Sequence, residues 1–194
     1  MFVEVLVVGI GSFAALAGFV VAIAGYGNLG GLAPIFSSAW GSGLAIAFSY
    51  ALGILVDRGA DQLLKPARRN LRRQHFSSNA AFDQARRIVG RSADLMARAD
   101  YARSRMRVCR GWLLNSVLIA FVVDLIIIRS SFPDRLLLVF LATVMGVLLA
   151  LGFYAAWRSI TVTGYKKLAQ QSQPTVPGQQ AFTEPNLSAG SSQS

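Results

Sequence analysis

The chain has 194 residues, of which 54% are hydrophobic and only 14% are charged, with a formal net charge of +10. Soluble domains carry about 25% charged residues, so this composition argues against a soluble fold. One cysteine and one histidine exclude an internal disulfide, a multi-cysteine metal site and a pair of histidine ligands.

Four apolar runs, at about residues 2–26, 32–56, 112–130 and 135–157, are each long enough to cross a bilayer as a helix. About 20 apolar residues span a ~30 Å hydrocarbon core, because a helix rises about 1.5 Å per residue. The sequence therefore predicts an all-α integral membrane protein with four transmembrane helices. Two transmembrane hairpins, residues 1–56 and 112–158, are joined by residues 57–111, here called the basic arm.

The first run has an alternative interpretation as a cleaved signal peptide, because Ala22-Ile23-Ala24 looks like a small-residue cleavage site. The residues before it include Glu4 and no lysine or arginine. The run also exceeds the core of about 7–15 residues that is usual in signal peptides. Both features favour a retained membrane span.

Small residues recur at every fourth position in the first two spans, and residues four apart share one helix face. Such rows let helix backbones approach closely in lipid, where apolar packing alone drives association weakly. We expect the two spans to form a tight antiparallel hairpin, with Pro34 in the first turn of the second span and Trp40 packed between helices. The alternative is a seam between copies of the chain. The rows are Ala14, Gly18 and Ala22, followed by Ala39, Gly43, Ala47 and Ala51.

The basic arm contains fourteen of the nineteen basic residues and five acids, which leaves it at +9. Because basic loops remain in the cytoplasm, we expect the arm and both termini to be cytoplasmic. The excess of arginine over lysine, sixteen to three, is a weak indication of a bacterial chain, and hence of an inner membrane. The charge does not indicate nucleic-acid binding, because the aromatic interleaving of a base-stacking surface is missing.

A heptad alternation of apolar or small residues runs from Ala81 to Ile127 and predicts one helix of about 45 residues, with a bend allowed at Gly90. A second stripe of apolar residues lies earlier in the arm, on a helix that Pro66 should kink. The two stripes should pack against each other, so the basic arm should form a helical hairpin of coiled-coil type. The two halves differ in length, at about 28 Å and 50 Å as helix. The residues before Gly90 either fold aside or extend past the first half to a cytoplasmic protein partner. The preceding stripe consists of Ala60, Leu64, Ala67 and Leu71.

Most charges of the arm are spaced as helical pairs with an acid four residues before a base. These predicted pairs are Asp61–Lys65, Asp83–Arg87 and Asp94–Arg98. A second group has no accompanying acid and is expected to contact anionic lipid headgroups. This basic cluster consists of Arg68, Arg69, Arg72 and Arg73.

Two polar residues lie inside the third span. Asp124 is near its outer end and indicates an ion or proton pathway, unless Arg129 or Arg135 folds back to neutralise it. Asn115, like its neighbour Ser116, is expected to hydrogen-bond a neighbouring helix rather than a substrate.

Residues 159–194 form a tail that is rich in Gln, Ser, Pro and Gly from about residue 170, where we expect disorder. The chain contains no phosphate-binding loop, metal-ligand spacing or nucleophile motif, so neither an enzyme activity nor a cofactor is expected. The sequence favours a non-catalytic multi-pass protein that self-associates as a scaffold or small pore, with the basic arm as its coupling element. The alternatives are an ion-coupled transporter or transporter subunit that uses Asp124, and a membrane-embedded enzyme.

Overall fold

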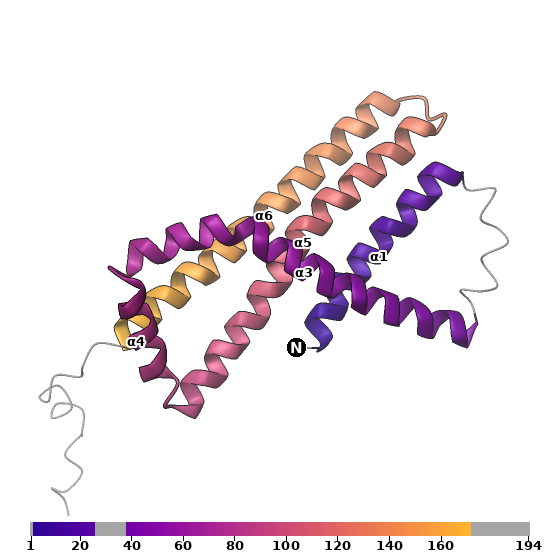
Figure 1. Ribbon diagram of the computed structural model, residues 1–194. Coiled ribbons are helices and arrows are strands. Elements are labelled where there is room, and N and C mark those ends of the chain that lie inside the picture. Colours follow the sequence, from indigo (N-terminus) through magenta and orange to yellow (C-terminus); the bar gives the residue numbers. More distant parts are fainter. Residues whose placement is uncertain (1, 26–37, 172–194) are drawn as a thin grey trace, which may run out of the picture.

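The computed structural model describes residues 2–25 and 38–171, and these residues form helices with no strand (Figure 1). The predicted all-helical class is confirmed for this part of the chain. The expectations for Pro34 and for the tail beyond residue 171 lie outside the described residues. The helices are α1 (Phe2–Ala24), α3 (Ala39–His75), α4 (Asn79–Val89), α5 (Ala93–Arg129) and α6 (Arg135–Gln171).

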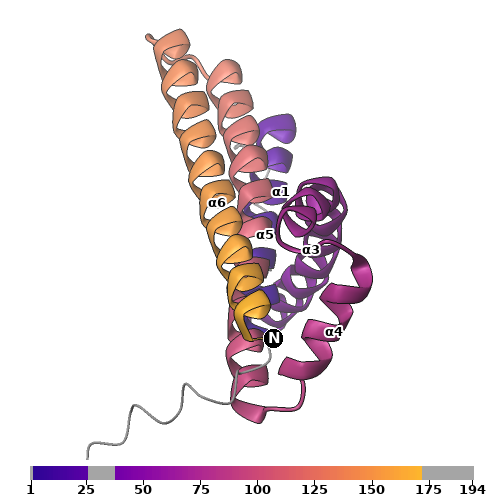
Figure 2. The same ribbon diagram turned by 90° about the vertical axis from the view of Figure 1, so that its left-hand side faces the viewer.

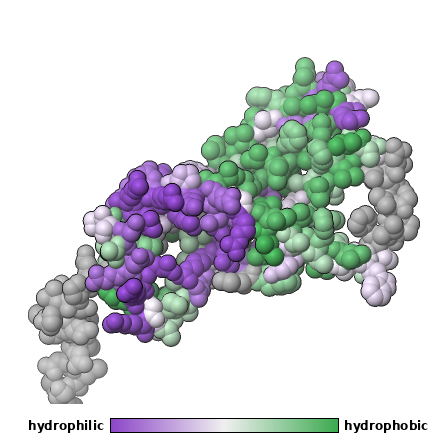
Figure 3. Space-filling model, in the orientation of Figure 1, coloured by the Kyte–Doolittle hydropathy of each residue, from purple (hydrophilic) through white to green (hydrophobic). Residues whose placement is uncertain are grey.

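Helices α1, α3, α5 and α6 are long and apolar enough to cross a membrane. Three of them have 37 residues, or about 55 Å of helix, so a ~30 Å core would take only part of each. Figure 3 shows apolar residues gathered at one end of the molecule and polar residues at the other. The apolar end exposes large side chains such as Leu136 and Phe140. This surface is consistent with a multi-pass membrane protein, because soluble monomers rarely expose so large an apolar area.

Helices α1, α5 and α6 run alongside one another, whereas α3 crosses them obliquely (Figures 1 and 2). The crossing of α1 and α3 depends on Gly53, where an added Cβ would overlap the carbonyl oxygen of Val5. Gly9 lies equally close to the carbonyl of Ser49. Small residues therefore do bring α1 and α3 together, as helices in lipid require.

The contact uses a different face of α3 from the predicted one. Gly53 and Ser49 are displaced by two positions, or about 200° around the helix, from the predicted row. That row, formed by Ala39, Gly43, Ala47 and Ala51, is exposed along its whole length. Trp40 is also exposed, at 87%, rather than packed between helices, because α3 begins at Ala39 and diverges from α1 there (Figure 1).

The first predicted row faces α5 rather than α3. Gly18 lies against Val122 of α5, and Ala22 is buried, whereas Ala14 is exposed. Helix α1 therefore packs on both α3 and α5, and Gly18 of the predicted row lies on the side that contacts α5.

The predicted continuous helix of about 45 residues is wrong. Helix α4 ends at Val89, and its capping residue Gly90 donates its backbone N–H to the carbonyl of Arg86. Ser92, in an extended conformation, precedes the start of α5. The chain therefore turns between the two helices, and α4 folds back beside the end of α6 (Figure 2). Of the two alternatives for the residues before Gly90, the structure therefore has the one in which they fold aside, and they do not extend past the first half of the arm.

The polar end contains more helix than predicted, because α6 continues to Gln171 beyond the expected end of the span. Tyr165, on this extension, lies 6.0 Å from the ring of Phe82 on α4 and 6.2 Å from Phe76 after α3. The sequence did not predict this extension, because it lacks a long apolar run. It is stabilised by these aromatic contacts with residues far away in the chain.

Candidate functional site

A buried polar contact joins α1 and α5 inside the apolar end. The side chain of Asn115 is fully buried, and its Nδ2 donates to the carbonyl of Val8 at 2.7 Å. Its Oδ1 accepts a hydrogen bond of 2.8 Å from Ser12. Val8 in turn packs on Gly111, where an added Cβ would lie 2.5 Å from a methyl group of Val8. Asn115 therefore bonds to a neighbouring helix, whereas Ser116 bonds to the carbonyl of Trp112 in its own helix.

Asp124 has a different environment. Its Oδ2 accepts a 2.8 Å hydrogen bond from Thr143 of α6, while its Oδ1 is buried and has no hydrogen-bond partner. Among the described residues, neither Arg129 nor Arg135 comes within salt-bridge distance, so the expected neutralising pair does not form. A carboxylate oxygen without a partner in an apolar setting is costly, which makes Asp124 a candidate functional residue.

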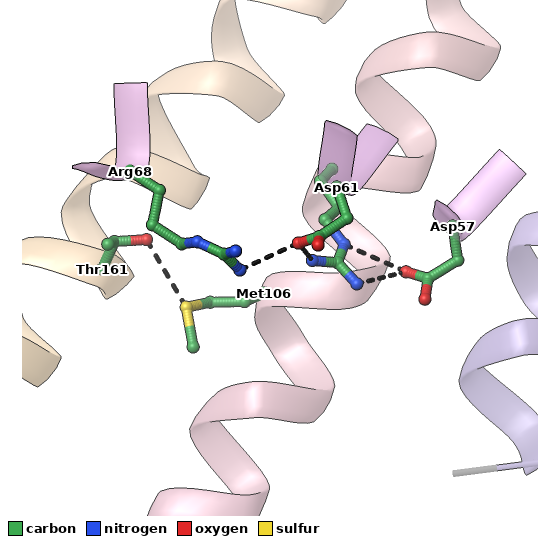
Figure 4. A network of polar contacts seen from close by, with 6 residues as sticks. Asp57, Asp61, Arg68, Met106 and Thr161 are labelled. Carbon is green, nitrogen blue, oxygen red and sulfur yellow. Dashed lines mark hydrogen bonds and ion pairs between the residues drawn. The ribbon is translucent and has the colours of Figure 1, made fainter. Parts of the chain in front are cut away.

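An ionic network lies where the apolar end meets the polar end. Arg110 of α5 contacts Asp57 of α3 at 2.7 Å and Asp61 at 2.6 Å, and Arg68 contacts Asp61 at 2.8 Å. Figure 4 shows Asp57, Asp61 and Arg68 on α3 converging beside Met106 of α5 and Thr161 of α6. The Arg110 and Asp57 side chains are only 14% and 16% exposed. The network therefore ties α3 to α5 in a setting that is partly shielded from water.

This network replaces the local pairs predicted from spacing. Asp61 contacts Arg68 and Arg110 rather than Lys65, and the described residues contain no Asp83–Arg87 pair within 4.0 Å. The side chain of Asp94 lies outside the description. The role of Arg110 escaped prediction because its acids lie 53 and 49 residues away in the sequence.

The basic cluster is divided by its surroundings. Arg68 is paired with Asp61, which corrects the expectation that no acid accompanies the cluster. The Arg72 guanidinium lies 5.3 Å from the centroid of the Phe82 ring, a cation–π contact. Arg69 and Arg73 are exposed. The four arginines therefore differ in their exposure and in their contacts.

A surface cavity of about 200 Å³ lies at the turn between α3 and α4. Its lining residues are Arg72, Arg73, Phe76, Ser77, Ser78 and Asn79. Over residues 2–25 and 38–171, no group of three or more histidine, cysteine, aspartate or glutamate side chains is placed to hold a metal ion.

Comparisons with protein-family models, with curated proteins and with solved structures found no match for this chain.

Proposed function

We propose that this protein is a non-catalytic, multi-pass protein of a bacterial inner membrane that self-associates as a scaffold or small pore. In this proposal the basic arm and both termini are cytoplasmic, because the arm holds most of the positive charge. The observation that carries the proposal is the exposed face of the apolar half of α3, opposite to the face that packs on α1. The basic arm is the element that couples the assembly to the cytoplasm.

One face of the apolar half of α3 packs on α1, and the opposite face is exposed. Trp40 is 87% exposed, Leu44 is 69% exposed, and among the described residues no atom lies within 4 Å of a Cβ added at Gly43. The exposed row of small residues on this half suits close helix packing better than it suits lipid chains. We therefore propose that the row of Ala39, Gly43, Ala47 and Ala51 contacts a second copy of the chain.

The ionic network supports the coupling role of the arm. Arg110 links α5 to the part of α3 that directly follows its apolar half. A displacement of α3 on self-association would act on this buried contact, because separating its charges in a shielded setting is costly. The basic arm would then change position together with the membrane helices.

Native mass spectrometry in mild detergent tests self-association. We expect the wild-type chain to form oligomers and Gly43→Leu to be monomeric, because a leucine would hold the two backbones apart. Gly152→Leu is the matched control, since Gly152 on α6 also has open space around it. A wild-type protein that is only monomeric, or a loss of oligomers in Gly152→Leu alone, would rule the α3 seam out.

The orientation has a separate test. A reporter inserted in the exposed turn at residues 90–91 should be active only in the form that works in the cytoplasm. Activity of a periplasmic reporter at that position would contradict the proposed topology.

The buried Oδ1 of Asp124 favours a second candidate function, ion-coupled transport. In this case Asp124→Asn should abolish ion flux in liposomes while leaving the helix content unchanged. Asp134→Asn is the matched control, because Asp134 is an exposed acid in the nearby turn. Unchanged flux in Asp124→Asn would remove this candidate. The contacts of the described residues lend no support to a membrane-embedded enzyme.

A further inference from the structure

The cavity between α3 and α4 is rich in hydrogen-bond donors. Arg72 and Arg73 come from the last turn of α3, and Ser77, Ser78 and Asn79 follow in the turn and at the start of α4. Within the described part of the chain, no acidic side chain lines this cavity. The lining therefore carries two positive charges with polar groups beside them, in a volume of about 200 Å³.

The two arginines differ from Arg68 in being available to a ligand. The guanidinium of Arg68 is occupied by Asp61 at 2.8 Å. Arg73 is exposed, and Arg72 is positioned over the ring of Phe82, which leaves its hydrogen-bond donors free of carboxylates. Arginine near a helix C-terminus also stabilises the helix dipole, but that effect does not require a polar cavity beside it.

We propose that this cavity binds a phosphate group. The planar guanidinium donates paired hydrogen bonds that match phosphate oxygens, and hydroxyl and amide groups complete such sites. Ser77 and Asn79 supply those groups here, while the Ser78 hydroxyl oxygen accepts from the backbone N–H of Ala81 at 3.1 Å and keeps its own proton to donate. The phosphate comes from an anionic lipid headgroup or from a soluble phosphate compound. This proposal does not depend on self-association.

Isothermal titration calorimetry of the full-length protein in neutral detergent tests the site. The salt concentration is about 0.15 M, because salt at this level screens nonspecific attraction between distant exposed charges. Four probes are used: dioctanoyl phosphatidic acid, dioctanoyl phosphatidylcholine, inorganic phosphate and a nucleoside triphosphate. We expect the phosphatidic acid or the nucleoside triphosphate to bind and the phosphatidylcholine not to bind. Binding of the phosphatidic acid alone identifies a lipid source, and binding of inorganic phosphate or of the triphosphate identifies a soluble source.

Two variants with the same change of charge locate the binding. Arg73→Gln should weaken binding about tenfold, because it removes charge-assisted hydrogen bonds inside the cavity. Arg69→Gln, four residues earlier and also exposed, lies outside the lining and should change binding less than about threefold. Both positions are exposed, so both variants should fold. Equal losses in the two variants, or no binding of any anionic probe to the wild-type protein, would overturn the proposal.

Discussion

Arg110 on α5 and Asp57 on α3 form a 2.7 Å salt bridge although 53 residues separate them in the sequence. Both side chains are largely shielded from water, and the same guanidinium also contacts Asp61 at 2.6 Å. The contact lies at the end of the apolar half of α3 and one residue before Gly111, which packs on α1. Arg110 therefore joins α3 to the bundle at the place where the long apolar helices become polar.

Removing this arginine should destabilise the protein strongly. Arg110→Gln leaves Asp57 without its charged partner in a shielded position, and we expect a loss of about 3 kcal/mol in the free energy of unfolding. The measurement is SDS-induced unfolding of the detergent-solubilised protein, followed by far-ultraviolet circular dichroism. The control is Arg103→Gln, whose pair with Asp100 has side chains that are 42% and 53% exposed. Its loss should stay below about 1 kcal/mol, and equal losses in the two variants would show that burial of the network is unimportant.

The Asn115–Ser12 hydrogen bond should give a measurable coupling between α1 and α5. In a double-mutant cycle of Ser12→Ala and Asn115→Ala, we expect a coupling energy of about 0.6 to 1.7 kcal/mol, from the average to the maximum found for hydrogen bonds between membrane helices. Stability in detergent is measured for the wild type, both single variants and the double variant. Strict additivity of the two changes would contradict a direct contact.

Two glycines on α3 should respond in opposite ways to alanine. Gly53→Ala should lower stability by about 1–3 kcal/mol, because the new Cβ overlaps the Val5 carbonyl and the helices must separate. Gly43→Ala has open space and should be neutral or slightly stabilising, since alanine favours helix by up to about 1 kcal/mol over glycine. Thermal unfolding in detergent distinguishes the two. A larger loss for Gly43→Ala than for Gly53→Ala would contradict the close contact of α1 and α3 at Gly53.

Helix α4 should detach from α6 when Phe82 is truncated. The Phe82 ring contacts Tyr165 at 6.0 Å and Phe76 at 5.2 Å, and the guanidinium of Arg72 lies over it. Phe82→Ala removes these contacts, so amide hydrogen exchange should increase across residues 79–89 while α5 stays protected. Tyr101→Ala serves as the control, because that ring is 66% exposed. Unchanged exchange in α4 would mean that the aromatic cluster does not hold it in place.

The helical class and two inward positions of the stripe from Ala60 to Leu71 followed from periodicity alone. Ala60 and Leu71 are buried as predicted, because apolar residues three or four apart share one helix face whatever they pack against. The partners of the charged residues could not be predicted from periodicity. Asp61 has a local candidate in Lys65, yet it pairs with Arg68 and Arg110, since a partly shielded guanidinium with two acids is a stronger partner than an exposed lysine.

Local spacing also failed to give the tertiary contacts of Asp124, of the residues around Gly90 and of the small-residue rows. Spacing identified Asp124 as the unusual acid, but only the packing of α6 supplied Thr143 and left Oδ1 without a partner. A heptad pattern continued through Gly90, although the backbone turns there and α4 finds its neighbour on α6. Rows of small residues indicated close packing, but not which rows would meet.

By itself, the sequence determined four helices long and apolar enough to cross a membrane and the segment that concentrates the positive charge, because both properties depend on residues near one another in the chain. The tertiary structure alone decided that α3 crosses the bundle at Gly53, that Arg110 reaches Asp57, and that Arg72 and Arg73 share a polar cavity. These contacts depend on how helices rotate and cross, and several rotations satisfy the same local pattern until side chains from distant segments fill the space.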